Sequence, residues 1–148
     1  QRRSAFARQV CPPYNMGLSA VFPMHHVILI ALGGALGALS RFWVGAAVRS
    51  AWSGSWPLGT FLINASGSLL IGVVFVLVER SQLHPDWRNV LMVGFLGAFT
   101  TFSTFSLETV GLWERGSPWL ALAYALTTTA VCVLAAAAGV FVTRQILA

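Results

Sequence analysis

Hydroxyl and aromatic side chains gather inside an apolar segment, in the stretch FLGAFTTFSTFSLE at residues 95–108. Gly97 lies within it and Gly94 just before it, and its hydroxyl residues include Thr100 and Thr101. Glycine weakens a helix, and Ser and Thr side chains compete for backbone groups, so the stretch predicts a helix break. At membrane depth a break survives only inside protein or beside a cavity, where its free carbonyls can hold a cation. The chemistry indicated is coordination of a small ion.

The phenylalanines suggest a second role. Phe102 and Phe105 are three residues apart and share a helix face. An aromatic ring carries a positive edge, so two ring edges in a dry path can meet an anion without a fixed charge. A packed aromatic core pair is the common alternative for this spacing. The surrounding hydroxyls favour the ion path.

Three strongly polar residues interrupt the apolar segments, namely Arg41, Asn64 and Glu108. Each costs a few kcal/mol at a bilayer centre, so such residues normally face protein or water. Arg41 and Glu108 are close enough to segment ends for their side chains to extend to the interface. Asn64 is too short for this, which leaves an interhelical hydrogen bond or a functional role.

Two polar stripes recur at a spacing of four residues, which places each on one helix face. They consist of Thr60, Asn64 and Ser68, and of Tyr124, Thr128 and Cys132. The stripes suit a narrow polar path, but nearby small residues equally favour a packing seam. Those small residues are Gly67, Gly72, Ala135 and Gly139.

The composition shows what positions these residues. The chain has 148 residues, 57% hydrophobic and 9% charged, where a soluble domain carries roughly 25% charged residues. Four apolar segments cover about residues 27–48, 57–78, 90–113 and 118–143. Each is long enough, as a helix, to cross a hydrocarbon layer of about 30 Å, and none alternates like a barrel strand. We predict an all-α membrane protein with four transmembrane helices, the third broken near mid-membrane.

Residues 24–148 form the predicted transmembrane domain, and residues 1–23 form an N-terminal extension. The extension has three arginines and three prolines but neither an apolar core nor a cleavage site for a secretory signal. We expect it to be disordered or to come from an over-long start upstream of Met24. We assign His25 and His26 to the membrane interface and not to a ligand set.

The distribution of arginines and cysteines disfavours a nucleic-acid partner, a disulfide and a metal cluster. All nine basic residues are arginines. Three lie in the extension, Arg41 lies within a span and the other five lie at or near segment ends, so they do not gather on one face and a nucleic-acid partner is not expected. Cys11 and Cys132 lie far apart, so neither a disulfide nor a metal cluster is indicated. The arginines outside the extension and the spans are nearly balanced between the two sides, which suits a dual-topology protein and also arises by chance when charges are few. One side of the membrane has Arg80, Arg88 and Arg144, and the other side has Arg49 and Arg115.

Three motifs together resemble the CrcB/Fluc family of fluoride channels. They are GAFTTFSTF at residues 97–105, GGALGALSRF at 33–42 and GTFLINASGS at 59–68, and the likeness runs from residue 24 to about 144. The resemblance implies a dual-topology homodimer of two antiparallel chains with two fluoride pores. It implies a multi-pass protein of the cell inner (plasma) membrane that passively exports toxic cytoplasmic fluoride, with membrane lipid around it. It is not an enzyme family.

The resemblance also assigns roles to positions. A structural sodium ion would be held by the backbone carbonyls of Gly97 and Thr100 from each chain, and Arg41 would lie near a pore vestibule. Glu108 matches a carboxylate that follows the third motif, with no role assigned. The fluoride pore would be lined by Asn64, Phe102, Phe105, Thr60, Ser103, Thr104, Tyr124 and Thr128. The departures from the family pattern are Phe42 for Tyr, Ala98 for Gly and Cys132 for a small hydroxyl residue.

Two other functions compete with the channel. A small multidrug-type, proton-coupled exporter needs a carboxylate in its first span, where this chain carries Arg41, and Glu108 is its only membrane carboxylate. A non-transporting membrane assembly subunit would explain the small residues but not two polar stripes and a broken span. An enzyme is disfavoured because no nucleophile–base pair can be named.

Overall fold

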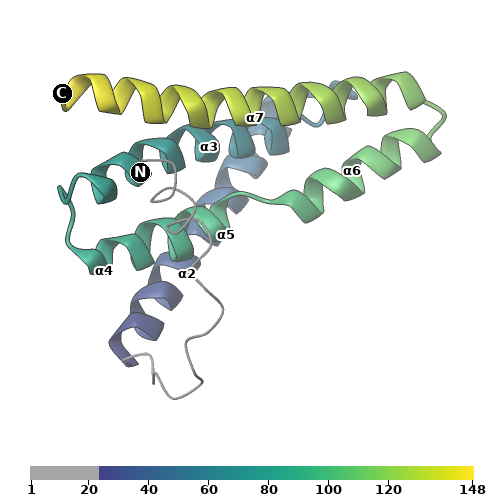
Figure 1. The fold of residues 1–148 in the computed structure, drawn as a ribbon. Coiled ribbons are helices and arrows are strands. Elements are labelled where there is room, and N and C mark those ends of the chain that lie inside the picture. The colour runs from purple at the N-terminus through teal and green to yellow at the C-terminus, as the bar shows by residue number, and fades with distance from the viewer. Residues whose placement is uncertain (1–23) are drawn as a thin grey trace, which may run out of the picture.

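The computed structural model describes residues 24–148, so the expectations for residues 1–23 lie outside the described residues. The described chain is helical, and its third span is assembled from several short elements (Figure 1). The elements in order are α2 (Met24–Ala51), α3 (Leu58–Glu79), α4 (Pro85–Arg88), the π-helix η1 (Asn89–Leu96), α5 (Gly97–Phe99), α6 (Phe102–Glu114) and α7 (Pro118–Ile146).

Four helical stretches are long and apolar enough to cross a membrane, which confirms the predicted number of spans. They are Met24–Ala51, Leu58–Glu79, Asp86–Glu114 and Pro118–Ile146, and each predicted segment lies within a few residues of one of them. Trp52, Trp113 and Trp119 are exposed close to the helix ends, where indole rings favour the membrane interface. The chain is therefore a multi-pass membrane protein.

The helices pack in two sets. α3 lies along α7, and α6 also packs on α7 (Figure 1). α2 crosses the first half of the third span and contacts chiefly η1 and α5. Each half of the third span thus rests on a different neighbour.

Glycines bring α2 against the third span. A Cβ added at Gly33 would collide with the Val90 carbonyl oxygen, and one at Gly37 with the Phe95 carbonyl oxygen. A Cβ at Gly94 would lie 2.8 Å from the Ile30 carbonyl oxygen. Backbone therefore meets backbone at this crossing, as small residues allow in membrane bundles.

A second glycine contact joins α3 to α7. A Cβ at Gly72 would collide with the Ala136 carbonyl oxygen, and one at Gly139 with the Leu69 carbonyl oxygen. This part of the contact is a small-residue packing seam, one of the two alternatives that the sequence allowed for the stripes. The polar members of the two stripes lie further along the same helices, beside the third span.

The third span is interrupted where the hydroxyl-rich stretch predicts a break. Thr100 (φ −75°, ψ 155°) and Thr101 (φ −149°, ψ 112°) are extended and separate α5 from α6. Gly94 is not at the interruption, because it lies within η1 at the crossing with α2. The π-helical form of Asn89–Leu96, with its i→i+5 hydrogen bonds, was not predicted from the sequence.

Candidate functional site

Asn64 of α3 hydrogen bonds the backbone at the interruption in the third span. Its Nδ2 donates to the Thr101 carbonyl oxygen at 3.0 Å, and its Oδ1 accepts from the Thr101 N–H at 2.8 Å. In a continuous α-helix that N–H would bond the Gly97 carbonyl. The Asn64 amide therefore replaces a turn of helix and releases the Gly97 carbonyl from this partner.

The hydroxyls of the interruption stabilise its two ends. Thr100 Oγ1 donates to the Leu96 carbonyl at 2.9 Å and so terminates α5. Thr101 is the N-cap of α6, because its Oγ1 accepts from the Thr104 N–H at 3.2 Å. Threonine is among the preferred N-cap residues. Thr101 Oγ1 also lies 3.0 Å from Thr104 Oγ1 and 3.3 Å from Ser103 Oγ.

Glu108 of α6 joins the two polar stripes. Its Oε1 accepts a hydrogen bond from Thr60 Oγ1 of α3 at 2.9 Å, and its Oε2 accepts one from the Tyr124 hydroxyl of α7 at 2.8 Å. Thr60 and Tyr124 are buried. Glu108 thus faces protein and is engaged between three spans. The sequence gives the faces of α3 and α7, but not the residue of α6 that meets both.

Aromatic rings pack beside the hydrogen-bonded group of Thr60, Glu108 and Tyr124. The Phe105 ring is buried, and its centroid lies 5.5 Å from that of Phe102 and 5.3 Å from that of Tyr124. Trp56 packs edge-to-face on Tyr124 at 5.3 Å. Phe102, in contrast, is 78% exposed on the described chain. The two phenylalanines are in contact, but only Phe105 belongs to the core.

A pocket of about 310 Å³ lies beside the interruption. Thr128 Oγ1 is buried there with no hydrogen-bond partner among the described residues. A buried hydroxyl without a partner is costly, so it marks a place where a ligand or water is expected. The pocket is bordered by Asn64, Ser68, Thr100, Thr101, Phe102, Phe105, Thr128 and Cys132, with other small and apolar residues.

A second pocket, of about 360 Å³, lies on the Glu108 side. Arg41 and Arg49 both border it, so two cationic residues lie along its wall. Its other polar side chains include Thr60, Thr104 and Glu108. Thr101 borders both pockets.

The structure brings most of the proposed pore residues together around the two pockets. Ser103 and Thr104 are exposed on α6, both contact Thr101, and Thr104 also borders the second pocket. Gly97 is exposed at the start of α5, and Thr100 follows at its end. Cys132 borders the same pocket as Thr128, one turn further along α7.

Known proteins are similar to this chain over most of its length. The family model described as "CrcB-like protein, Camphor Resistance (CrcB)" matches residues 28–140. A fluoride-specific ion channel FluC from Hahella chejuensis is 46% identical over 123 residues, which is 82% of this chain and 97% of that protein.

Two further relatives carry the same name. The FluC of Nitratidesulfovibrio vulgaris is 52% identical over 101 residues, covering 68% of this chain and 81% of the relative. The FluC of Saccharophagus degradans is 40% identical over 136 residues, covering 87% and 99%. The family model matches more than half of the chain, and these relatives are at least 40% identical over two thirds of it or more, so the chain belongs to the CrcB family.

Proposed function

We propose that this chain forms a fluoride channel through which cytoplasmic fluoride leaves the cell passively. The observation that carries the proposal is the pocket beside the interrupted span, where the Thr128 hydroxyl, which has no partner within residues 24–148, lies with Asn64 and Phe105. A small anion must exchange its hydration shell for close polar contacts, and hydroxyl and amide groups are suitable donors. The names of the curated relatives support fluoride as that anion.

The charges near the second pocket favour an anion. Arg41 and Arg49 border it against one carboxylate, and a cleft with an excess of positive charge concentrates anions. The carboxylate of Glu108 is engaged by Thr60 and Tyr124 on its two oxygens. This arrangement of charges fits a path in which fluoride enters at the second pocket, beside the arginines, and passes through the first pocket, beside Asn64.

A homodimer of antiparallel chains completes the proposal. Ser103 and Thr104 are exposed beside an interruption in the middle of a span, together with the Phe102 ring. Polar groups at membrane depth need protein or water beside them. A second copy would cover this face and enclose the pocket, and the near-balance of arginines on the two sides supports insertion in both orientations. For cytoplasmic fluoride to be exported, such a dimer would lie in the inner (plasma) membrane.

A structural sodium ion at the dimer centre is part of the same proposal. The residues fit this ion, because the Thr101 N–H donates to Asn64 instead of the Gly97 carbonyl, and Thr100 is extended. Carbonyl oxygens of Gly97 and Thr100 from two copies would supply hard ligands suited to sodium. The bound ion would hold the two interruptions together.

Fluoride release from liposomes tests the function. Purified protein is reconstituted with fluoride inside, valinomycin and potassium balance the charge, and an electrode follows efflux, with chloride-loaded vesicles as the control. Rapid fluoride release that requires the ionophore, with chloride retained, is expected. A folded, dimeric protein that releases no fluoride would contradict the proposal. Drug–proton exchange at Glu108 would then be measured. If the protein showed no exchange either, the remaining alternative would be a non-transporting assembly subunit.

A further inference from the structure

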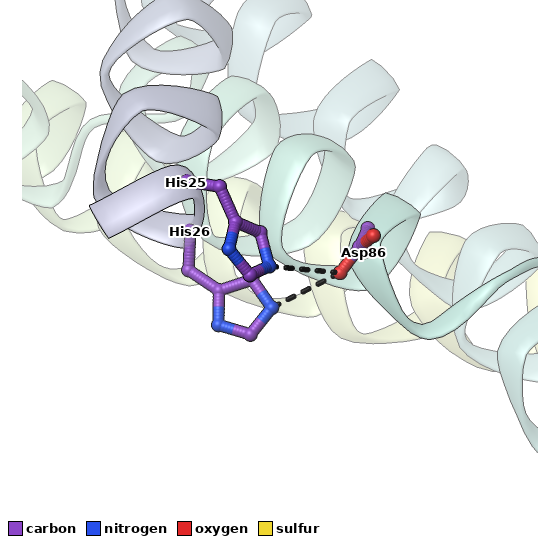
Figure 2. Close-up of side chains that lie close together, drawn as sticks. All are labelled: His25, His26 and Asp86. Atoms are coloured by element: carbon purple, nitrogen blue, oxygen red, sulfur yellow. Dashed lines mark hydrogen bonds and ion pairs between the residues drawn. The ribbon is translucent and has the colours of Figure 1, made fainter. Parts of the chain in front are cut away.

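Three side chains converge where α2 meets the start of the third span. His26 Nε2 lies 3.0 Å from Asp86 Oδ1, and His25 Nε2 lies 4.0 Å from the same oxygen (Figure 2). The histidines belong to the first turn of α2, and Asp86 belongs to α4. The cluster therefore joins two elements that are 60 residues apart in the sequence.

The orientation of the two histidines is unusual for neighbours on a helix. Successive residues normally point to different sides and do not face each other. Here the ring centroids lie 4.2 Å apart, and Figure 2 shows both rings directed toward Asp86. His26 alone is close enough to hydrogen bond with the carboxylate. His25 lies beyond hydrogen-bond distance, so a hydrogen bond does not account for its direction.

The geometry points to a site for a divalent transition-metal ion of the zinc class, with His25, His26 and Asp86 as its three protein ligands. One ligand atom from each residue can be chosen so that all lie within 4.8 Å of one another. Zinc binds nitrogen and carboxylate oxygen at about 2.0–2.2 Å, so small side-chain rotations bring the three atoms into contact with one ion. Water would occupy the fourth position.

The donor set decides the class of metal. Imidazole nitrogen suits zinc, nickel and copper, whereas calcium and magnesium select oxygen ligands. The site is open to water, since the side chains of His26 and Asp86 are 26% and 36% exposed. An ion can therefore arrive without opening the bundle. A bound ion would crosslink the start of α2 to the start of the third span and stabilise the folded chain by mass action.

His84 provides an internal control, because it approaches the same carboxylate without joining the cluster. Its Nδ1 lies 3.3 Å from Asp86 Oδ2, whereas the other two histidines approach Oδ1. It is also highly exposed. A three-ligand site predicts that loss of His84 matters much less than loss of His26.

Zinc binding to the full-length protein tests the site, with any affinity tag removed and metal stripped by chelator. Titration calorimetry at neutral pH is expected to show one zinc per chain, with no response to magnesium or calcium. His26→Ala and Asp86→Asn are expected to weaken binding more than about 100-fold, beyond the range of outer-shell changes, and His84→Ala less than about tenfold. Glu79→Gln, at another carboxylate on the protein surface, should bind as the parent does.

Thermal unfolding gives a second readout. Zinc is expected to raise the Tm of the parent and of His84→Ala, but not that of Asp86→Asn, and binding should weaken at acid pH because protons compete for the ligands. Failure of the parent to bind zinc, equal binding by Asp86→Asn, or equal losses in His84→Ala and His26→Ala would each overturn the three-ligand site. Fluoride transport is not used in either measurement, so this result is independent of the channel proposal.

Discussion

Asn64 and Thr101 exchange two hydrogen bonds across 37 residues of sequence, one to the backbone N–H of Thr101 and one to its carbonyl. A single side-chain amide thus satisfies both backbone groups of a residue that has left the helix. Thr101 is buried, so without Asn64 these groups would have no water to replace the lost bonds. The second span therefore determines the conformation of the third.

Replacement of Asn64 by Ala is expected to damage both stability and transport. Each buried backbone group left without a partner costs about 1–3 kcal/mol. Hydrogen bonds to a charged group contribute about 1.5–3 kcal/mol, so loss of a donor to fluoride should slow efflux about 10- to 100-fold. Chemical unfolding in detergent and liposome efflux measure the two effects.

Ser66→Ala is the matched control for Asn64. Ser66 lies on the same helix, but its hydroxyl donates to the Leu62 and Ile63 carbonyls of its own helix. This variant should unfold and transport like the parent. If it lost as much efflux as Asn64→Ala, the effect would belong to α3 in general and not to the contact with Thr101.

Replacement of Phe105 by Leu should reduce fluoride efflux while the protein remains folded. Leucine keeps most of the apolar contact but has no ring edge to offer an anion. Truncation of this buried ring also loosens the contact with Tyr124, so a stability loss of about 1–2 kcal/mol is expected. Phe141→Leu, at an exposed ring on α7, is the control and should leave efflux unchanged. Normal efflux in folded Phe105→Leu would remove the ring from the pathway.

Glu108 separates the channel from a proton-coupled exporter. In Glu108→Gln the Thr60 and Tyr124 hydroxyls keep an amide partner, because a hydroxyl can accept as well as donate. A neutral hydrogen bond contributes about 0.5–1.5 kcal/mol, so efflux should stay within about tenfold of the parent. Efflux should also require no proton gradient. Transport that stops in Glu108→Gln and follows an imposed pH gradient in the parent would favour the exporter.

Glu108→Leu tests the structural role of the same residue. Leucine leaves the hydroxyls of Thr60 and Tyr124 buried without their shared acceptor, at a cost of about 1–3 kcal/mol each. Unfolding in detergent should therefore show Glu108→Leu to be less stable than Glu108→Gln. Equal stability of the two variants would mean that the carboxylate is not needed to join the three spans.

Two adjacent glycines test the crossing of α2 with the third span. A Cβ at Gly33 collides with the Val90 carbonyl, whereas a Cβ at Gly34 meets only the Gly94 carbonyl at 3.9 Å, an ordinary contact. Gly33→Ala should lose about 1–3 kcal/mol of stability through overpacking. Gly34→Ala should be neutral, or gain up to about 1 kcal/mol from helix propensity. Unfolding midpoints compare them, and equal midpoints would contradict the backbone contact.

The spans and the interruption follow from local pattern, which is why the sequence predicts them well. Hydropathy over twenty residues marks each span, and the hydroxyls after Gly97 mark where the third helix ends and restarts. The stripes on α3 and α7 are also local, because a spacing of four residues defines a helix face. Thr60 and Asn64 indeed lie on one face, but they meet different partners.

The partners across helices depend on rotation and depth, which a single sequence does not encode locally. Nothing near Glu108 signals that it meets Thr60 and Tyr124 at once. The convergence of His25 and His26 on Asp86 likewise needs the ends of two distant helices side by side. The π-helical turns of Asn89–Leu96 depend on hydrogen-bond register, to which hydropathy is insensitive.

The long sequence separation of the polar contacts has a consequence for biogenesis. Asn64 and Thr60 are synthesised 37 and 48 residues before Thr101 and Glu108, the groups that they bond. At about 5–20 residues per second, α3 waits roughly 2–10 s for these partners. During that interval the two polar side chains lack these partners. The hydrogen bonds that join the second span to the third can therefore form only after the ribosome has delivered the third.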